Sequence, residues 1–218
     1  MKRLLSFLLL CSSLAAGACT KDSANAPGKW SFGAILANQS FHPETGTDVH
    51  LFPGFIVRRS YNAFTLRTAF EGAYHSQNSG GAPYPDATYS VGESWDATLR
   101  FGIEKGWKTC GFIRPYFAAD LGVSAYGTDN RLIGGIAGYT QEQKYDRRSA
   151  GFMPAAGIEF CFGKHIGLAV ETQAALMYEK STSQMIYYTG NVDTRPQTES
   201  GFFAYFNHPA SLTFDFWF

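Results

Sequence analysis

The chain alternates apolar and polar residues in short runs that are bounded by glycine, proline or polar residues. In 64–71 and 96–104 an apolar side chain occupies nearly every second position. A period of two predicts strands with one apolar face. Eight such segments are expected, at about 30–37, 50–58, 64–71, 96–104, 112–124, 153–162, 166–176 and 211–218. The pattern therefore predicts an all-β protein.

The connections between these segments alternate in length. Short turns are expected at 59–62, 105–108 and 163–164, and long polar loops at 39–48, 76–89, 127–146 and 181–200. Outer-membrane barrels have short periplasmic turns and long external loops. The rhythm thus predicts an eight-stranded antiparallel up-and-down transmembrane β-barrel with short periplasmic turns and long extracellular loops. A soluble β-sandwich is the alternative, but nothing in a sandwich would sort loop length in this way.

The last expected strand carries large apolar residues at alternate positions: Leu212, Phe214, Phe216 and Phe218. This stretch resembles the closing strand of Gram-negative outer-membrane barrels, which the barrel-assembly machinery recognises. The resemblance implies that this machinery is a partner during insertion.

The composition of the polar strand faces distinguishes a membrane barrel from a soluble, lipocalin-like barrel, because only the membrane barrel has its apolar face outside. These faces combine small residues with arginines and carboxylates but carry no lysine. A soluble protein would place lysines on its outward faces. Charges inside a narrow barrel must pair, because an unpartnered buried charge costs several kcal/mol. We expect a lumen charge network of Arg67, Glu71, Arg100, Glu104, Arg114, Asp120, Glu159, Glu171 and Asp215. Arg58 shares the polar face with them.

Aromatic residues are expected at the strand ends, where outer-membrane barrels carry interfacial girdles. They are Trp30, Tyr61, Tyr74, Trp95, Trp107 and Tyr178. Together with the strand pattern, these residues make the chain resemble the small outer-membrane β-barrel superfamily that includes OmpX and the OmpA transmembrane domain. The run 51–59 is similar to second strands of small Bacteroidetes barrels. No periplasmic domain like that of OmpA follows the barrel, so peptidoglycan anchoring is not implied.

The amino-terminal residues resemble an export signal. A basic start, an apolar run and small residues predict a signal peptide at 1–18, followed by a flexible periplasmic leader at 19–29 and the barrel domain at 30–218. Cleavage at an A-x-A site and lipidation of Cys19 in a lipobox-like segment both fit the sequence. Cys110 and Cys161 are expected on the lumen face of neighbouring strands. They form either a cross-strand disulfide or two free thiols offset by register.

The sequence contains little that indicates catalysis. His208 begins a segment that only partly resembles the His-x-Ser-Asn motif of the lipid A deacylase PagL, and the five histidines lack metal-ligand spacing. We therefore expect no cofactor and no metal. Eighteen basic and 18 acidic residues give zero net charge, which indicates no nucleic-acid partner.

The expected function is that of a non-enzymatic structural or adhesive surface protein, or of an accessory subunit in a larger outer-membrane complex. The small barrel of the type IX secretion apparatus is one example by resemblance. Outer-membrane lipid and lipopolysaccharide are the expected surroundings, and contacts are expected at the loop tips 43–48, 76–85, 130–145 and 187–198. A narrow pore and a lipid-modifying enzyme are the alternatives.

Overall fold

The computed structural model describes residues 29–42, 46–79, 89–107, 112–134, 139–163, 165–187 and 195–218. The predicted signal peptide, Cys19 and nearly all of the predicted leader lie outside these residues. The described residues form eight strands: β1 (Trp30–His42), β2 (Gly46–Ser60), β3 (Thr65–Ser79), β4 (Tyr89–Gly106), β5 (Ile113–Gly134), β6 (Tyr139–Phe162), β7 (Ile166–Tyr187) and β8 (Gln197–Trp217).

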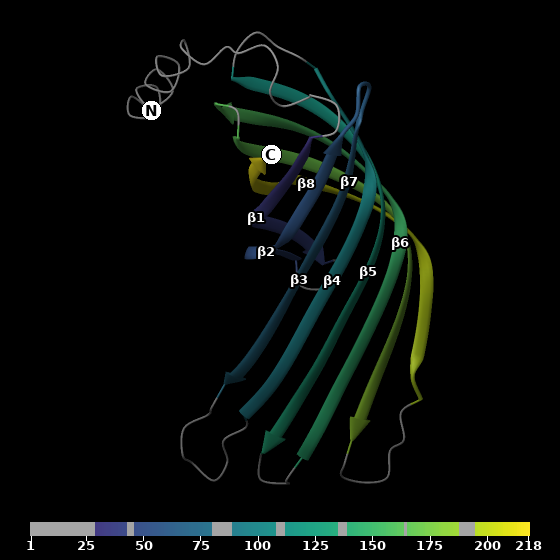
Figure 1. Ribbon diagram of the computed structural model, residues 1–218. Coiled ribbons are helices and arrows are strands. Elements are labelled where there is room, and N and C mark those ends of the chain that lie inside the picture. The colour runs from purple at the N-terminus through teal and green to yellow at the C-terminus, as the bar shows by residue number, and fades with distance from the viewer. Residues whose placement is uncertain are drawn as a thin grey trace, which may run out of the picture.

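Each strand pairs antiparallel with its neighbours in chain order, and β1 also pairs with β8, so the sheet closes into a barrel (Figure 1). Closure runs from Ser31 opposite Trp217 to Asn38 opposite Ser211. The backbone N–H groups of Trp30 and Phe218 donate to each other's carbonyl oxygens at 3.2 and 3.0 Å. The last strand therefore completes the ring, as the alternation predicts.

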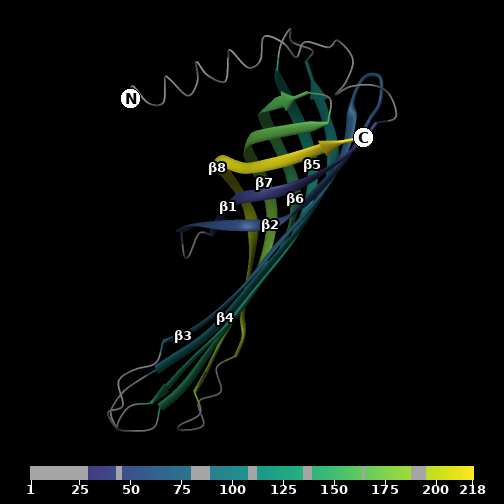
Figure 2. The ribbon, with the colours of Figure 1, turned by 60° about the vertical axis from the view of Figure 1, so that its left-hand side comes forward.

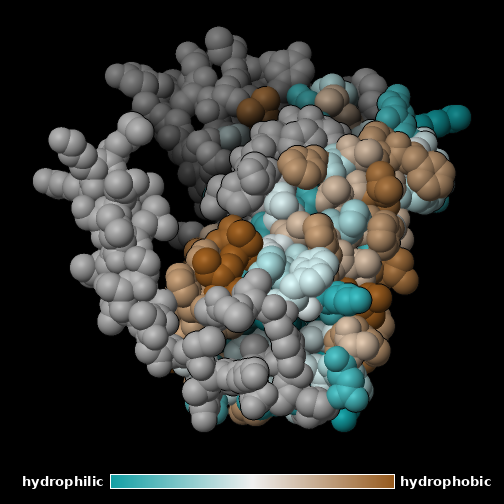
Figure 3. All heavy atoms as spheres, turned by 90° about the horizontal axis from the view of Figure 1, so that it is seen from above, coloured by the Kyte–Doolittle hydropathy of each residue, from teal (hydrophilic) through white to brown (hydrophobic). Residues whose placement is uncertain are grey.

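The two faces of the sheet are reversed relative to those of a water-soluble barrel. Leu121 is 68% exposed on the outside, whereas Arg67 is 2% exposed inside. The same contrast recurs along the chain, and Figure 3 shows many hydrophobic residues on the outer surface. Alternate side chains of a strand point to opposite faces. The period of two in the sequence thus separates an apolar outer wall from a charged interior.

Several strands are longer than the sequence predicts. The expectation of long loops was largely wrong at 127–146 and over the described parts of 39–48 and 181–200, whereas most of the loop expected at 76–89 lies outside the described residues. β5 continues to Gly134 and β6 begins at Tyr139, so most of 127–146 is a paired hairpin. The prediction failed because it required an apolar face. A strand whose two faces both meet polar surroundings needs only its backbone ladder and cross-strand pairs.

Charged side chains from both strands stabilise that hairpin. Arg131 lies opposite Glu142 in register, and its Nη2 donates to Glu142 Oε1 at 3.0 Å. Lys144 Nζ lies 3.2 Å from the same oxygen. Partial burial and the neighbouring Glu142 carboxylate raise the pKa of Asp129. Ion pairs across the strands take the place of apolar packing here.

The ring extends into an open sheet at one end. Within the described residues, β2 pairs with β3 as far as Glu71, and β1 pairs with β8 as far as Ser211. Beyond these positions β3 to β8 continue as a curved sheet past the ends of β1 and β2 (Figures 1 and 2). The outer edges of β3 and β8 are therefore the edges of the extended sheet. None of the residues described belongs to a helix long and apolar enough to cross a membrane.

Candidate functional site

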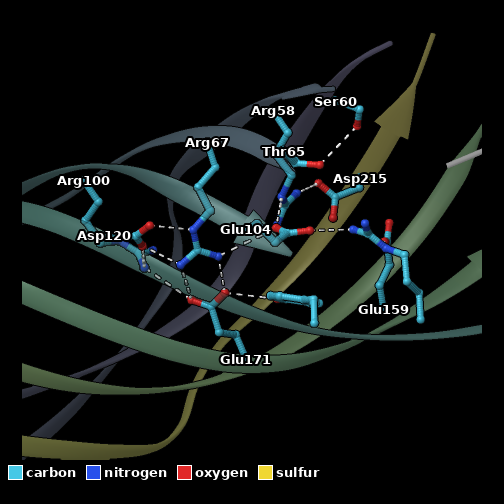
Figure 4. A network of polar contacts seen from close by, with 12 residues as sticks. Arg58, Ser60, Thr65, Arg67, Arg100, Glu104, Asp120, Glu159, Glu171 and Asp215 are labelled. Atoms are coloured by element: carbon cyan, nitrogen blue, oxygen red, sulfur yellow. Dashed lines mark hydrogen bonds and ion pairs between the residues drawn. The ribbon is translucent and has the colours of Figure 1, made fainter. Parts of the chain in front are cut away.

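Ten charged side chains, the nine of the predicted network and Arg58, lie together in the barrel interior. Figure 4 labels all of them except Glu71 and Arg114. Six strands deliver nine of them: Arg67 and Glu71 from β3, Arg100 and Glu104 from β4, Arg114 and Asp120 from β5, Glu159 from β6, Glu171 from β7 and Asp215 from β8. Arg58 comes from β2. All ten side chains are at most 6% exposed. The interior is thus filled by charge.

Arg67 is the centre of the part nearer the extended sheet. Its Nη2 lies 2.5 Å from Asp120 Oδ2, and its Nη1 lies 2.6 Å from Glu171 Oε2. Arg100 pairs with Glu71 and reaches Glu171 Oε1 at 3.3 Å. Two guanidinium groups therefore share the Glu171 carboxylate, which comes from the opposite side of the ring.

Arg114 and Arg58 organise the other part of the network. Arg114 donates to Glu159 Oε2 at 2.6 Å and to Glu104 Oε1 at 2.7 Å. Arg58 donates to Glu104 Oε2 at 3.1 Å and pairs with Asp215. The Nη1 of Arg67 lies 3.9 Å from Glu104 Oε2 and links the two parts. The ion pairs thus form one continuous plug.

Two aromatic side chains that the sequence reasoning did not single out also contact the network. The Tyr116 hydroxyl donates to Glu171 Oε2 at 3.0 Å, and the Trp217 indole Nε1 donates to Glu159 Oε1 at 2.9 Å. Both share the parity of the inward-facing charges in their strands, Arg114 and Asp215. That parity was the available signal, but only charged residues were assigned to the network.

Gly157 makes room for Tyr116, its partner in the β5–β6 register. A Cβ at Gly157 would collide with the tyrosine ring and lie 2.7 Å from its Cε1 atom. We predict that Gly157→Ala destabilises the barrel by about 1–3 kcal/mol, as overpacking of a filled interior does. The free energy of unfolding from urea titration in detergent measures this.

Gly201→Ala in β8 is the matched control, because its Cβ would meet Phe203 only at 3.4 Å. Equal stability of the two variants would contradict the close packing of Tyr116 against Gly157.

The charged groups of the network pair mainly with one another, and two of their buried atoms, Arg100 Nε and Asp215 Oδ2, have no hydrogen-bond partner. Each arginine is engaged by carboxylates, and each carboxylate accepts from at least one arginine. No cluster of three or more His, Cys, Asp or Glu residues suited to a metal ion occurs among the residues described. The arrangement fits a structural plug.

The outer wall has aromatic residues at two levels. Trp30, Tyr61 and Trp107 lie near the end where the chain closes the ring. Trp95 does not lie at a strand end, as the sequence analysis expected, but well inside β4, opposite Tyr74. Tyr178 lies inside β7 and contacts the Phe202 ring with centroids 5.1 Å apart. The second aromatic level, formed by Tyr74, Trp95 and Tyr178, lies within the strands and not at their ends, because the strands continue beyond it.

The predicted disulfide stays a prediction, because Cys110 lies outside the described residues. Cys161 has the parity of the inward-facing Glu159 and is half-buried. Its backbone N–H donates to the Phe112 carbonyl oxygen at 2.7 Å, two residues from Cys110.

No protein-family model matches the chain, and no curated protein sequence is significantly similar to it.

Proposed function

We propose that this chain is an integral β-barrel of a bacterial outer membrane and that its plugged interior is structural. It would act as a non-enzymatic surface protein, adhesive or part of a larger assembly, through the sheet that extends beyond the ring. The observation that carries the proposal is the reversal of the two faces, with Leu121 exposed outside and Arg67 buried inside. In water this arrangement would expose a wide apolar surface and bury charge, and both are unfavourable.

The spacing of the two aromatic levels supports a membrane. Trp95 of β4 and Trp107, the residue that follows β4, are both exposed and are separated by 12 residues. At about 3.3 Å per residue and a tilt of about 40°, this separation corresponds to about 30 Å along the barrel axis. Aromatic girdles of outer-membrane barrels flank an apolar band about 25 Å tall. The outer wall therefore has the dimensions expected of a lipid-facing surface.

The signal-like residues at 1–18 support export. We infer that the short turns between the strands face the periplasm, as the short turns of outer-membrane barrels do. In that orientation the extension of β3 to β8 projects from the cell surface. Its β3 and β8 edges offer backbone groups that can pair with a strand of another protein. We infer that a partner protein binds there.

Membrane insertion is tested by fractionation and by gel mobility before and after boiling. We expect the protein in the outer-membrane fraction, with a mobility shift on boiling and with cleavage of the extension by protease added to intact cells. A soluble periplasmic protein without a shift would contradict the proposal. Stable current steps in planar bilayers would contradict the structural role of the interior and favour a pore.

Surface function is tested by shortening the hairpin of β5 and β6. Thr128 lies opposite Tyr145, so a tight turn can replace the residues between them without disturbing the ring. We expect the shortened protein to keep its mobility shift but to lose attachment of producing cells to surfaces or its co-purifying outer-membrane partner. Wild-type behaviour of the shortened protein in both assays would contradict a role for this extension.

A further inference from the structure

A groove of about 380 Å³ crosses the outer face of β3 to β6. Phe70, Leu99 and Val123 form one side of it, and Ala97 and Ala125 lie at its base. Arg148 is the one charged residue that lines it. The rest of the groove's outward-facing lining is apolar, so its preferred occupant is an apolar group that reaches a negative charge.

The register of the strands explains the shape of the groove. Gly72, Ala97, Ala125 and Arg148 follow one another as directly paired positions across four strands. The neighbouring row on the same face, Phe70, Leu99 and Val123, carries large side chains. A row of small residues beside a row of large ones leaves a straight apolar trough, about one side chain wide, that ends at Arg148. Such a trough suits one extended acyl chain.

Two cations meet at that end of the groove. Arg148 lies directly opposite Lys180 of β7, and both are exposed on the outer face. Neither forms an ion pair with any other residue that the structure describes. Like charges at directly opposite positions are destabilising. An anion bound between them would remove that cost. The nearby carboxylate of Asp146 lies two residues farther toward the hairpin tip and is separated from the groove by Arg148.

The groove is inclined relative to the ring. Gly72 is seven residues from the start of β3 at Thr65, whereas Arg148 is 14 residues from the end of β6 at Phe162. Both of these strand ends belong to the side on which the chain closes the ring. The cationic end is therefore nearer the extended sheet, and the apolar trough descends from it along the outer wall.

We propose that this groove binds one acyl chain of a lipid A molecule and that Arg148 and Lys180 bind a lipid A phosphate. The inference rests on the proposed function, which places the extended sheet outside the cell. In that orientation the cationic end lies at the headgroup level of the outer leaflet, and the trough descends into its acyl region. Arginine and lysine are the usual protein ligands of phosphate groups.

The test is native mass spectrometry of the purified barrel in detergent, titrated with diphosphoryl lipid A. Arg148→Ser with Lys180→Ser is expected to weaken lipid A binding at least tenfold. Ala97→Phe with Ala125→Phe, which fills the trough but keeps both cations, is expected to weaken it similarly. Arg59→Ser with Lys105→Ser is the matched control, because it removes the same charge from exposed positions near the opposite end of the ring. The control is expected to bind like the wild type.

Phosphatidylglycerol and phosphatidylcholine are titrated in parallel. Equal affinity for phosphatidylglycerol and lipid A would overturn the assignment to lipid A, and unchanged lipid A binding by either groove variant would overturn the site. Gel mobility of the same samples before and after boiling separates the two proposals. A mobility shift on boiling without lipid A binding would refute the lipid A site and leave the membrane barrel intact. Absence of the shift in the wild-type protein would refute the membrane barrel itself.

Discussion

Replacing Arg67 with leucine is expected to destabilise the barrel by about 3–5 kcal/mol. The substitution removes the guanidinium group that contacts both Asp120 and Glu171 and leaves two buried carboxylates with fewer partners. A buried charge that loses its partner has neither water nor an ion pair to stabilise it. Urea titration of the protein in detergent or lipid vesicles, followed by tryptophan fluorescence, gives the free energy of unfolding.

Arg131→Leu is the control for that experiment. Arg131 also pairs with a carboxylate, on Glu142, but its own side chain is 53% exposed. The Glu142 carboxylate is buried, but Lys144 Nζ stays 3.2 Å from its Oε1 atom when Arg131 is removed, so the control is expected to cost less than Arg67→Leu. Adding Asp120→Asn and Glu171→Gln to Arg67→Leu is expected to recover part of the loss, because the charges left behind are then removed. A cost below about 1 kcal/mol for Arg67→Leu would show that the network is not a buried plug.

Leu121→Arg is expected to cost about 2–4 kcal/mol when the barrel is in a lipid bilayer. Leu121 lies between Phe101 and Phe152 on the outer wall, far from both aromatic levels. An arginine at this depth loses its hydration to lipid tails. Stability in vesicles, again by urea titration, measures the cost.

Leu132→Arg supplies the matched comparison on the same strand. Leu132 is also exposed, but it lies in the extension beyond the ring. We expect this variant to change stability by less than about 0.5 kcal/mol, as surface substitutions in water usually do. If both leucines tolerate arginine equally, the outer wall of β5 faces water and the membrane proposal is wrong.

The alternation of residues along the chain was enough to predict the strands of the ring and the face that each charge occupies. In β4, Leu99, Phe101 and Ile103 are exposed while Arg100 and Glu104 are buried, and this follows from parity alone. The extension of β5 and β6 could not be predicted in this way. Its strands have no apolar face, and their stability depends on pairs such as Arg131 with Glu142 that exist only in the correct register.

The partners within the charge network also exceeded what the sequence could predict. Arg67 contacts Asp120 two strands away and Glu171 four strands away in chain order. Parity places each side chain inside but does not specify its depth. Depth depends on strand tilt and on the bulges near Ala37 and Thr172, which shift the register on both sides of β8. The sequence was therefore enough to predict which charged residues lie inside, but not which of them contact each other.

The ion pairs of the interior also constrain how the protein folds. Arg58 and Asp215 are 157 positions apart in the chain, and Arg67 and Glu171 are 104 apart. Contacts between such distant positions form slowly, because chain entropy is lost before they can stabilise the product. A half-closed ring would hold several of these charges without partners, so each intermediate is less favourable than either endpoint. We therefore expect barrel formation to be a single cooperative step. Once Asp215 has paired with Arg58, opening of the barrel is expected to have a high kinetic barrier.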